Sequence, residues 1–62
     1  MIWHVGYDGM AIPVAAETTE EAREKAKKYL EEKGYRINLI TVSEASEGYL
    51  EWIENYKIVI LQ

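Results

Sequence analysis

His4 is the residue of this chain best suited to acid–base chemistry, because it is the only histidine. A general base needs a partner group within hydrogen-bonding reach. Asp8 shares the strand face of His4 but lies about 13 Å farther along an extended strand, which is too far. Neither Ser43 nor Ser46 forms a recognisable Ser-His-Asp arrangement with these residues. We therefore expect that the protein is not an enzyme.

The composition gives little support for a metal or cofactor site. The chain has no cysteine, and a single histidine is a poor basis for structural zinc. Gly6 and Gly9 flank a turn and lead to no helix, so they do not form a phosphate-binding loop. An acidic run lacks the Asp/Asn/Gly spacing of a calcium loop and consists of Glu44, Glu47, Glu51 and Glu54. We expect no metal and no cofactor.

The same acidic run lies in a stretch without basic residues, from position 37 to position 56. On a helix three of these glutamates would share one face. That pattern fits an ordinary solvated face, and it also fits an acidic surface that mimics nucleic acid or meets a basic partner. Aromatic residues flanked by charge are typical of protein–protein hot spots, and three of them stand here, namely Tyr49, Trp52 and Tyr56. The alternative is that Trp52 covers the core.

Basic residues are concentrated in one segment, and they suggest nucleic-acid binding as an alternative function. The candidate contacts are Arg23, Lys27 and Lys28. The same segment carries five glutamates, so no net basic stripe results, and the chain as a whole has a net charge of −4. Nucleic acid is therefore the less favoured partner.

Residues 1–16 predict a β-hairpin. Asp8-Gly9 is a strong signal for a two-residue type I′ turn, in which both central residues need φ > 0. This turn would pair Tyr7 with Met10 and place alternate side chains on one apolar face. Pro13 has no N–H, so it predicts that the second strand lies at the edge of the sheet with its nitrogen turned away from the first strand.

Residues 18–33 predict a helix, with Thr18 and Glu21 as a capping box and Gly34 after its end. Residues 35–43 and 56–61 predict two more strands, with apolar side chains on both faces. Segment 44–55 fits a short helix or irregular turn, which we favour, and also a short strand.

These elements predict an α+β fold with the order β-β-α-β-β, in a single domain over residues 1–62. One helix would pack on a four-stranded, mainly antiparallel sheet of strand order 2-1-3-4, and a strand in 44–55 would add a fifth. The second sheet face would keep an apolar patch around Ile2 and His4. Such patches mark interfaces, so we expect a homodimer or a complex with another protein.

No membrane span or signal peptide is recognisable, which predicts a cytoplasmic protein. Scarce Asn and Gln with abundant Glu, Lys, Ile and Tyr fit a thermophilic source. The hairpin followed by the segment from Ala16 to Ala22 and a Lys/Glu-rich helix resembles HicB-type antitoxins and small phage or plasmid proteins of the DpnD kind. The resemblance covers roughly residues 1–33, rests on hairpin and capping chemistry, and implies no functional residue.

The sequence therefore predicts a small protein-interaction module. One concrete form is an inhibitor or adaptor from a phage or other mobile element that acts on a larger host machine. The residues expected to make the contacts are Tyr49, Trp52, Tyr56, Ile2 and His4.

Overall fold

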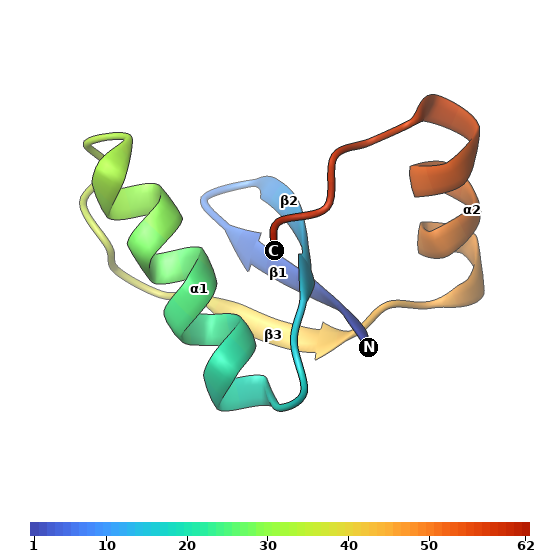
Figure 1. The fold of residues 1–62 in the computed structure, drawn as a ribbon. Coiled ribbons are helices and arrows are strands. Elements are labelled where there is room, and N and C mark those ends of the chain that lie inside the picture. The colour runs from blue at the N-terminus through green and yellow to red at the C-terminus, as the bar shows by residue number, and fades with distance from the viewer.

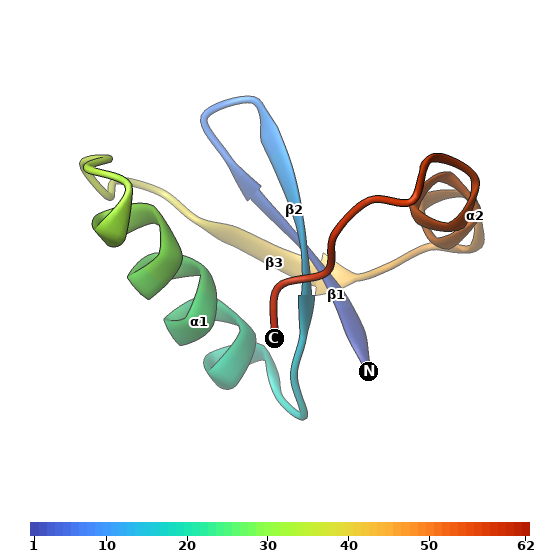
Figure 2. The same cartoon turned by 45° about the horizontal axis from the view of Figure 1, so that its top comes forward.

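The chain forms three strands and two helices in the order β-β-α-β-α, and a computed structural model describes all 62 residues. The elements are β1 (Ile2–Tyr7), β2 (Met10–Ala15), α1 (Thr19–Glu32), β3 (Thr41–Glu44) and α2 (Glu47–Tyr56). The strands form one antiparallel sheet in which β1 lies between β2 and β3, and the two helices lie on opposite sides of it (Figures 1 and 2). The predicted α+β class and the order 2-1-3 are confirmed.

The hairpin forms with the predicted register. Tyr7 pairs with Met10 across the turn, and the pairing continues to Ile2 and Ala15. Asp8 and Gly9 have φ values of 46° and 80°, as a type I′ turn requires. This turn fixes which side chains of β1 and β2 share a face, and it therefore fixes the composition of both sheet faces.

The third strand is shorter than residues 35–43, because the chain must first return from the end of α1 to the sheet. Its backbone finds other partners on the way. The Tyr7 hydroxyl donates to the Arg36 carbonyl, and the Arg23 guanidinium donates to the Ile40 carbonyl at 2.7 Å. Only Thr41–Glu44 pairs with β1.

The predicted fourth strand over residues 56–61 is wrong, and so is its position beside strand 3. A single parallel bridge joins Leu61 to Val14, at the outer edge of β2. The Leu61 N–H donates to the Pro13 carbonyl, and the Ala15 N–H donates to the Leu61 carbonyl, both at 2.8 Å. A parallel ladder extended toward Val59 would next need the N–H of Pro13, which proline lacks. Pro13 therefore limits this pairing to one bridge.

Segment 44–55 contains a helix, as favoured, and the five-stranded alternative is wrong. The Ser46 hydroxyl caps α2 by accepting from the Tyr49 N–H at 3.2 Å. α2 ends with Lys57 in the left-handed region at φ 52°. Because α2 runs through Tyr56, it also takes the start of the predicted last strand.

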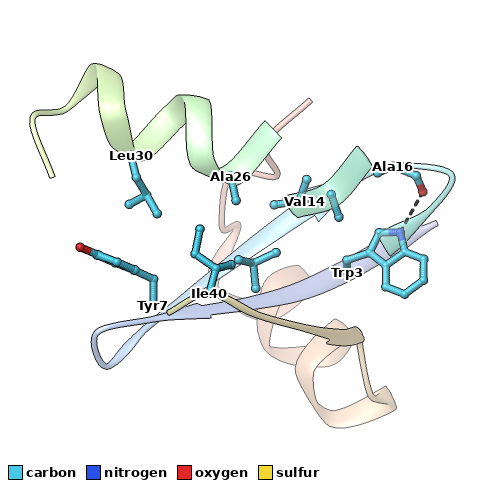
Figure 3. Close-up of a cluster of buried hydrophobic side chains, with 9 residues drawn as sticks. Trp3, Tyr7, Val14, Ala16, Ala26, Leu30 and Ile40 are labelled. Carbon is cyan, nitrogen blue, oxygen red and sulfur yellow. Dashed lines mark hydrogen bonds between the residues drawn. The ribbon is translucent and has the colours of Figure 1, made fainter. Parts of the chain in front are cut away.

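The core lies between the sheet and α1 (Figure 3). Val5 and Val14 from the hairpin meet the small residues Ala22 and Ala26 of α1, and all four are fully buried. Small side chains let the helix approach the sheet closely. The Trp3 indole N–H donates to the Ala16 carbonyl at 3.0 Å, so the largest core residue has its polar atom satisfied (Figure 3).

Two glycines give a matched test of backbone conformation. Gly34 follows α1 at φ 84°, where an alanine is strained, so Gly34→Ala is expected to lower the free energy of unfolding by about 1 kcal/mol. Gly48 lies inside α2 with open space at its Cβ position, so Gly48→Ala is expected to raise it by about 0.5 kcal/mol. Urea unfolding followed by circular dichroism measures both, and effects of the same sign would contradict the assigned conformations.

Candidate functional site

Helix α2 covers part of the sheet face that lies opposite α1. β3 leads into it directly, and the Ala45 N–H donates to the Ile2 carbonyl at 3.2 Å, which ties the connection to the first strand. Figure 2 shows α2 on the far side of the sheet from α1. The second face of the sheet, which the sequence predicted to be uncovered, is therefore partly covered by α2.

Four aromatic side chains form a row that runs from the sheet outward along α2. The rings of His4 and Tyr49 stack at a centroid distance of 4.2 Å and an angle of 11°. Tyr49 stacks on Trp52 at 5.6 Å, and Trp52 lies 6.4 Å from Tyr56. We call these four residues the aromatic row. Its spacing on α2, at i, i+3 and i+7, places the three rings on one side of the helix.

Exposure increases along the aromatic row. His4 and Tyr49 are half-buried, Trp52 is 39% exposed and Tyr56 is 70% exposed. Ile53 is the one buried residue of α2, at 7% exposure. Tyr49 and Ile53 therefore anchor the helix, while Trp52 and Tyr56 present aromatic surface to solvent.

The structure thus brings together four of the five residues that the sequence predicts for an interaction site. The fifth, Ile2, lies on the same face of β1 as His4 and is half-buried. The helical spacing of the α2 aromatics makes them recognisable in the sequence. The stacking of His4 on Tyr49 is not predictable in this way, because the contact joins residues 45 positions apart and depends on where α2 docks.

The hydroxyl of Tyr49 is buried and has no hydrogen-bond partner. Burial accordingly raises the pKa of Tyr49 above its usual value, because the phenolate would lose solvation. A buried polar atom without a partner costs free energy in the folded state. The stacking of the Tyr49 ring with His4 and with Trp52 holds the residue in place despite this cost.

Tyr49→Phe is therefore expected to preserve or raise stability, by up to about 1 kcal/mol, although it removes a hydroxyl. The pH dependence should also change. A phenol whose pKa is raised by folding stabilises the folded state below its unfolded pKa of about 10 and loses that contribution as pH rises through the folded pKa. We therefore expect the free energy of unfolding to fall less between neutral pH and pH values above about 10 in Tyr49→Phe than in the unmodified protein, as measured by urea unfolding. Destabilisation of Tyr49→Phe at neutral pH would show instead that the Tyr49 hydroxyl makes a hydrogen bond in the folded protein.

The solvent-facing side of α2 is acidic. At 100° per residue, Glu47, Glu51 and Glu54 lie opposite Tyr49, and all three are exposed. Trp52 borders this acidic stripe on one side, and the half-exposed Leu50 borders it on the other. The outer surface of α2 therefore combines negative charge with apolar and aromatic flanks.

The basic residues of α1 do not form a comparable surface. Arg23 is engaged with the Ile40 carbonyl, and Lys25 contacts both the Ala15 carbonyl at 2.8 Å and the Glu21 carboxylate at 3.2 Å. Lys27 and Lys28 remain exposed among the glutamates of the same helix. Of the alternative nucleic-acid contacts, two lysines are left, and they form no continuous positive stripe.

The structure shows no cluster of three or more histidine, cysteine, aspartate or glutamate side chains that could hold a metal ion. Neither helix combines the length and apolar character needed to cross a membrane. In comparisons with known proteins, no family model matches this chain, and no curated protein or solved structure shows a significant match, so the resemblance of residues 1–33 carries no family assignment.

Proposed function

We propose that this chain is a non-enzymatic protein-interaction module that binds a basic segment of another protein through the outer surface of α2. The observation that carries the proposal is the aromatic row, which ends in exposed Trp52 and Tyr56, and of these two residues Trp52 borders the acidic stripe. Aromatic residues supply the largest share of binding free energy in protein interfaces. The face of an aromatic ring also attracts a guanidinium or ammonium group.

The distribution of charge supports a basic partner. The four glutamates from Glu44 to Glu54 account for the whole net charge of −4, because the rest of the chain carries seven acidic and seven basic residues. Three of these four glutamates form the acidic stripe of α2. A field of one sign steers an oppositely charged partner toward this helix and suppresses partners of like charge.

The same charge argues against a second copy of the chain on this surface. Two α2 helices brought face to face would place their acidic stripes together, and like charges in contact cost several kcal/mol. The homodimer expected from the sequence also relied on an uncovered second sheet face, and α2 occupies part of that face. A different protein with positive charge satisfies both constraints.

Binding of a fluorescently labelled arginine-rich peptide, measured by anisotropy at about 50 mM and about 500 mM salt, tests the proposal. We expect saturable binding that weakens with salt. Trp52→Ala is expected to weaken it by roughly tenfold or more, because tryptophan dominates such contacts.

Two charge reversals separate a site from a general charge effect. Glu51→Lys on α2 and Glu31→Lys on α1 change the net charge equally, and both glutamates are exposed on helices. We expect Glu51→Lys alone to weaken binding strongly. Equal effects of the two reversals, or no binding at low salt, would overturn the proposal.

A further inference from the structure

An open groove lies between the outer edge of β2, the last turn of α1 and the C-terminal segment, and no residue of α2 lines it. Its volume is about 470 Å³, and its walls are mostly apolar, with Met10, Ile12, Leu30 and Ile58 among the lining residues. Figures 1 and 2 show the C-terminal segment returning beside β2. Volumes of roughly 300–1,000 Å³ with apolar walls and few polar groups are typical of small-molecule sites.

The groove remains open because the C-terminal segment does not pair with β2 along its length. The only bridge between them is at Val14 and Leu61, and the missing N–H of Pro13 stops the ladder there. Alternation along β2 then leaves the N–H and C=O of Ala11 directed outward, because Ala15, which has the same parity, donates outward to Leu61. Ala11 lines the groove, so an unpaired backbone donor and acceptor face it.

Lys33 is the only charged residue that lines the groove. Its ammonium lies 5.1 Å from the centroid of the Tyr29 ring, and both residues belong to the groove wall. The carbonyl groups at the C-terminal end of α1 attract the Lys33 ammonium only weakly, because two of them already accept hydrogen bonds. The Leu30 carbonyl accepts from the Tyr35 N–H, and the Glu31 carbonyl accepts from the Gly34 N–H, both at 3.0 Å. The ammonium is therefore free to meet an anion.

We propose that this groove binds a small molecule with an apolar body and one carboxylate. The body packs against Met10, Ile12, Leu30 and Ile58, and the carboxylate meets Lys33. A carboxylate fits better than a cation, because the one charged side chain of the groove, Lys33, is positive. A carboxylate also fits better than a neutral group, because Lys33 makes no ion pair within the protein and a carboxylate would give its ammonium a charge-assisted hydrogen bond. The Ala11 N–H offers a second donor to the same class of ligand.

Titration of the ¹⁵N-labelled protein with octanoate, followed by amide chemical shifts, tests this inference. We expect saturable shifts at Ala11, Ile12, Leu30 and Tyr35, with the amides of α2 unchanged. Octylammonium, which has the same body and the opposite charge, should bind about tenfold more weakly or not at all. Because α2 does not line the groove, failure here and failure of the peptide-binding proposal are distinguishable.

Lys33→Met retains an apolar stem of similar length and should weaken octanoate binding about tenfold. Lys27→Met on α1 lies outside the groove and should leave octanoate binding unchanged. Equal binding of octanoate and octylammonium, or an equal effect of both lysine variants, would overturn the proposal that Lys33 recognises a carboxylate. Slow hydrogen exchange at the Ala11 amide of the free protein would show that the C-terminal segment closes on β2, and would overturn the site itself.

Discussion

Leu30→Ala is expected to remove a large part of the stability of this protein and to lower its melting temperature. Leu30 lies in the last turns of α1, is 1% exposed and is one of the three largest fully buried side chains. Truncation of a buried leucine to alanine costs about 2–5 kcal/mol, through lost burial and the cavity left behind. A chain of 62 residues has a total stability of roughly 3–9 kcal/mol, so this single change removes a large part of it. Thermal unfolding followed by circular dichroism at 222 nm measures the loss.

Leu39→Ala is the matched control, because Leu39 undergoes the same truncation while 76% exposed. We expect its effect on the free energy of unfolding to stay within about 0.5 kcal/mol. A comparable loss in the two variants would show that the core does not lie between α1 and the sheet.

Tyr49→Ala is expected to detach α2 while the rest of the fold persists. A helix of 10 residues is marginal by itself, and α2 has one buried residue, Ile53, besides the Tyr49 ring stacked on His4. Loss of the ring removes one of these two anchors. Hydrogen exchange should then show α2 amides that exchange freely and hairpin amides that stay protected.

Tyr56→Ala serves as the control on the same helix, because Tyr56 is 70% exposed at the outer end of the aromatic row. We expect its α2 amides to retain their protection. If Tyr49→Ala also leaves α2 protected, the helix is held by contacts other than the aromatic row.

Local chemistry explains the parts of the fold that the sequence predicted. The Asp8-Gly9 turn sets the hairpin register within four residues, and Thr18 caps α1 by accepting from the Glu21 N–H at 3.1 Å. Gly34 ends the same helix in the left-handed region. In each case the determining residues are neighbours in sequence, so no knowledge of the tertiary structure is needed.

The wrong prediction concerns a segment whose structure depends on residues far away in the sequence. The run from Ile58 to Leu61 is rich in β-branched residues and favours a strand. Its pairing depends on Pro13, which lies more than 40 positions earlier and lacks the required N–H. The aromatic spacing of α2 was visible in the sequence, whereas its docking on His4 was not, because nothing local specifies which face of the sheet receives a helix.

The indole signals of the two tryptophans can show whether α2 binds a basic segment of another protein. Trp3 is buried with its indole N–H bonded to Ala16, whereas Trp52 is exposed on α2, so their indole signals report separately on the core and on the site. In a titration of the ¹⁵N-labelled protein with an arginine-rich peptide at low salt, we expect the Trp52 indole and the α2 amides to shift while the Trp3 indole stays fixed. Shifts confined to α1, or no shifts at all, would show that α2 does not bind such a segment.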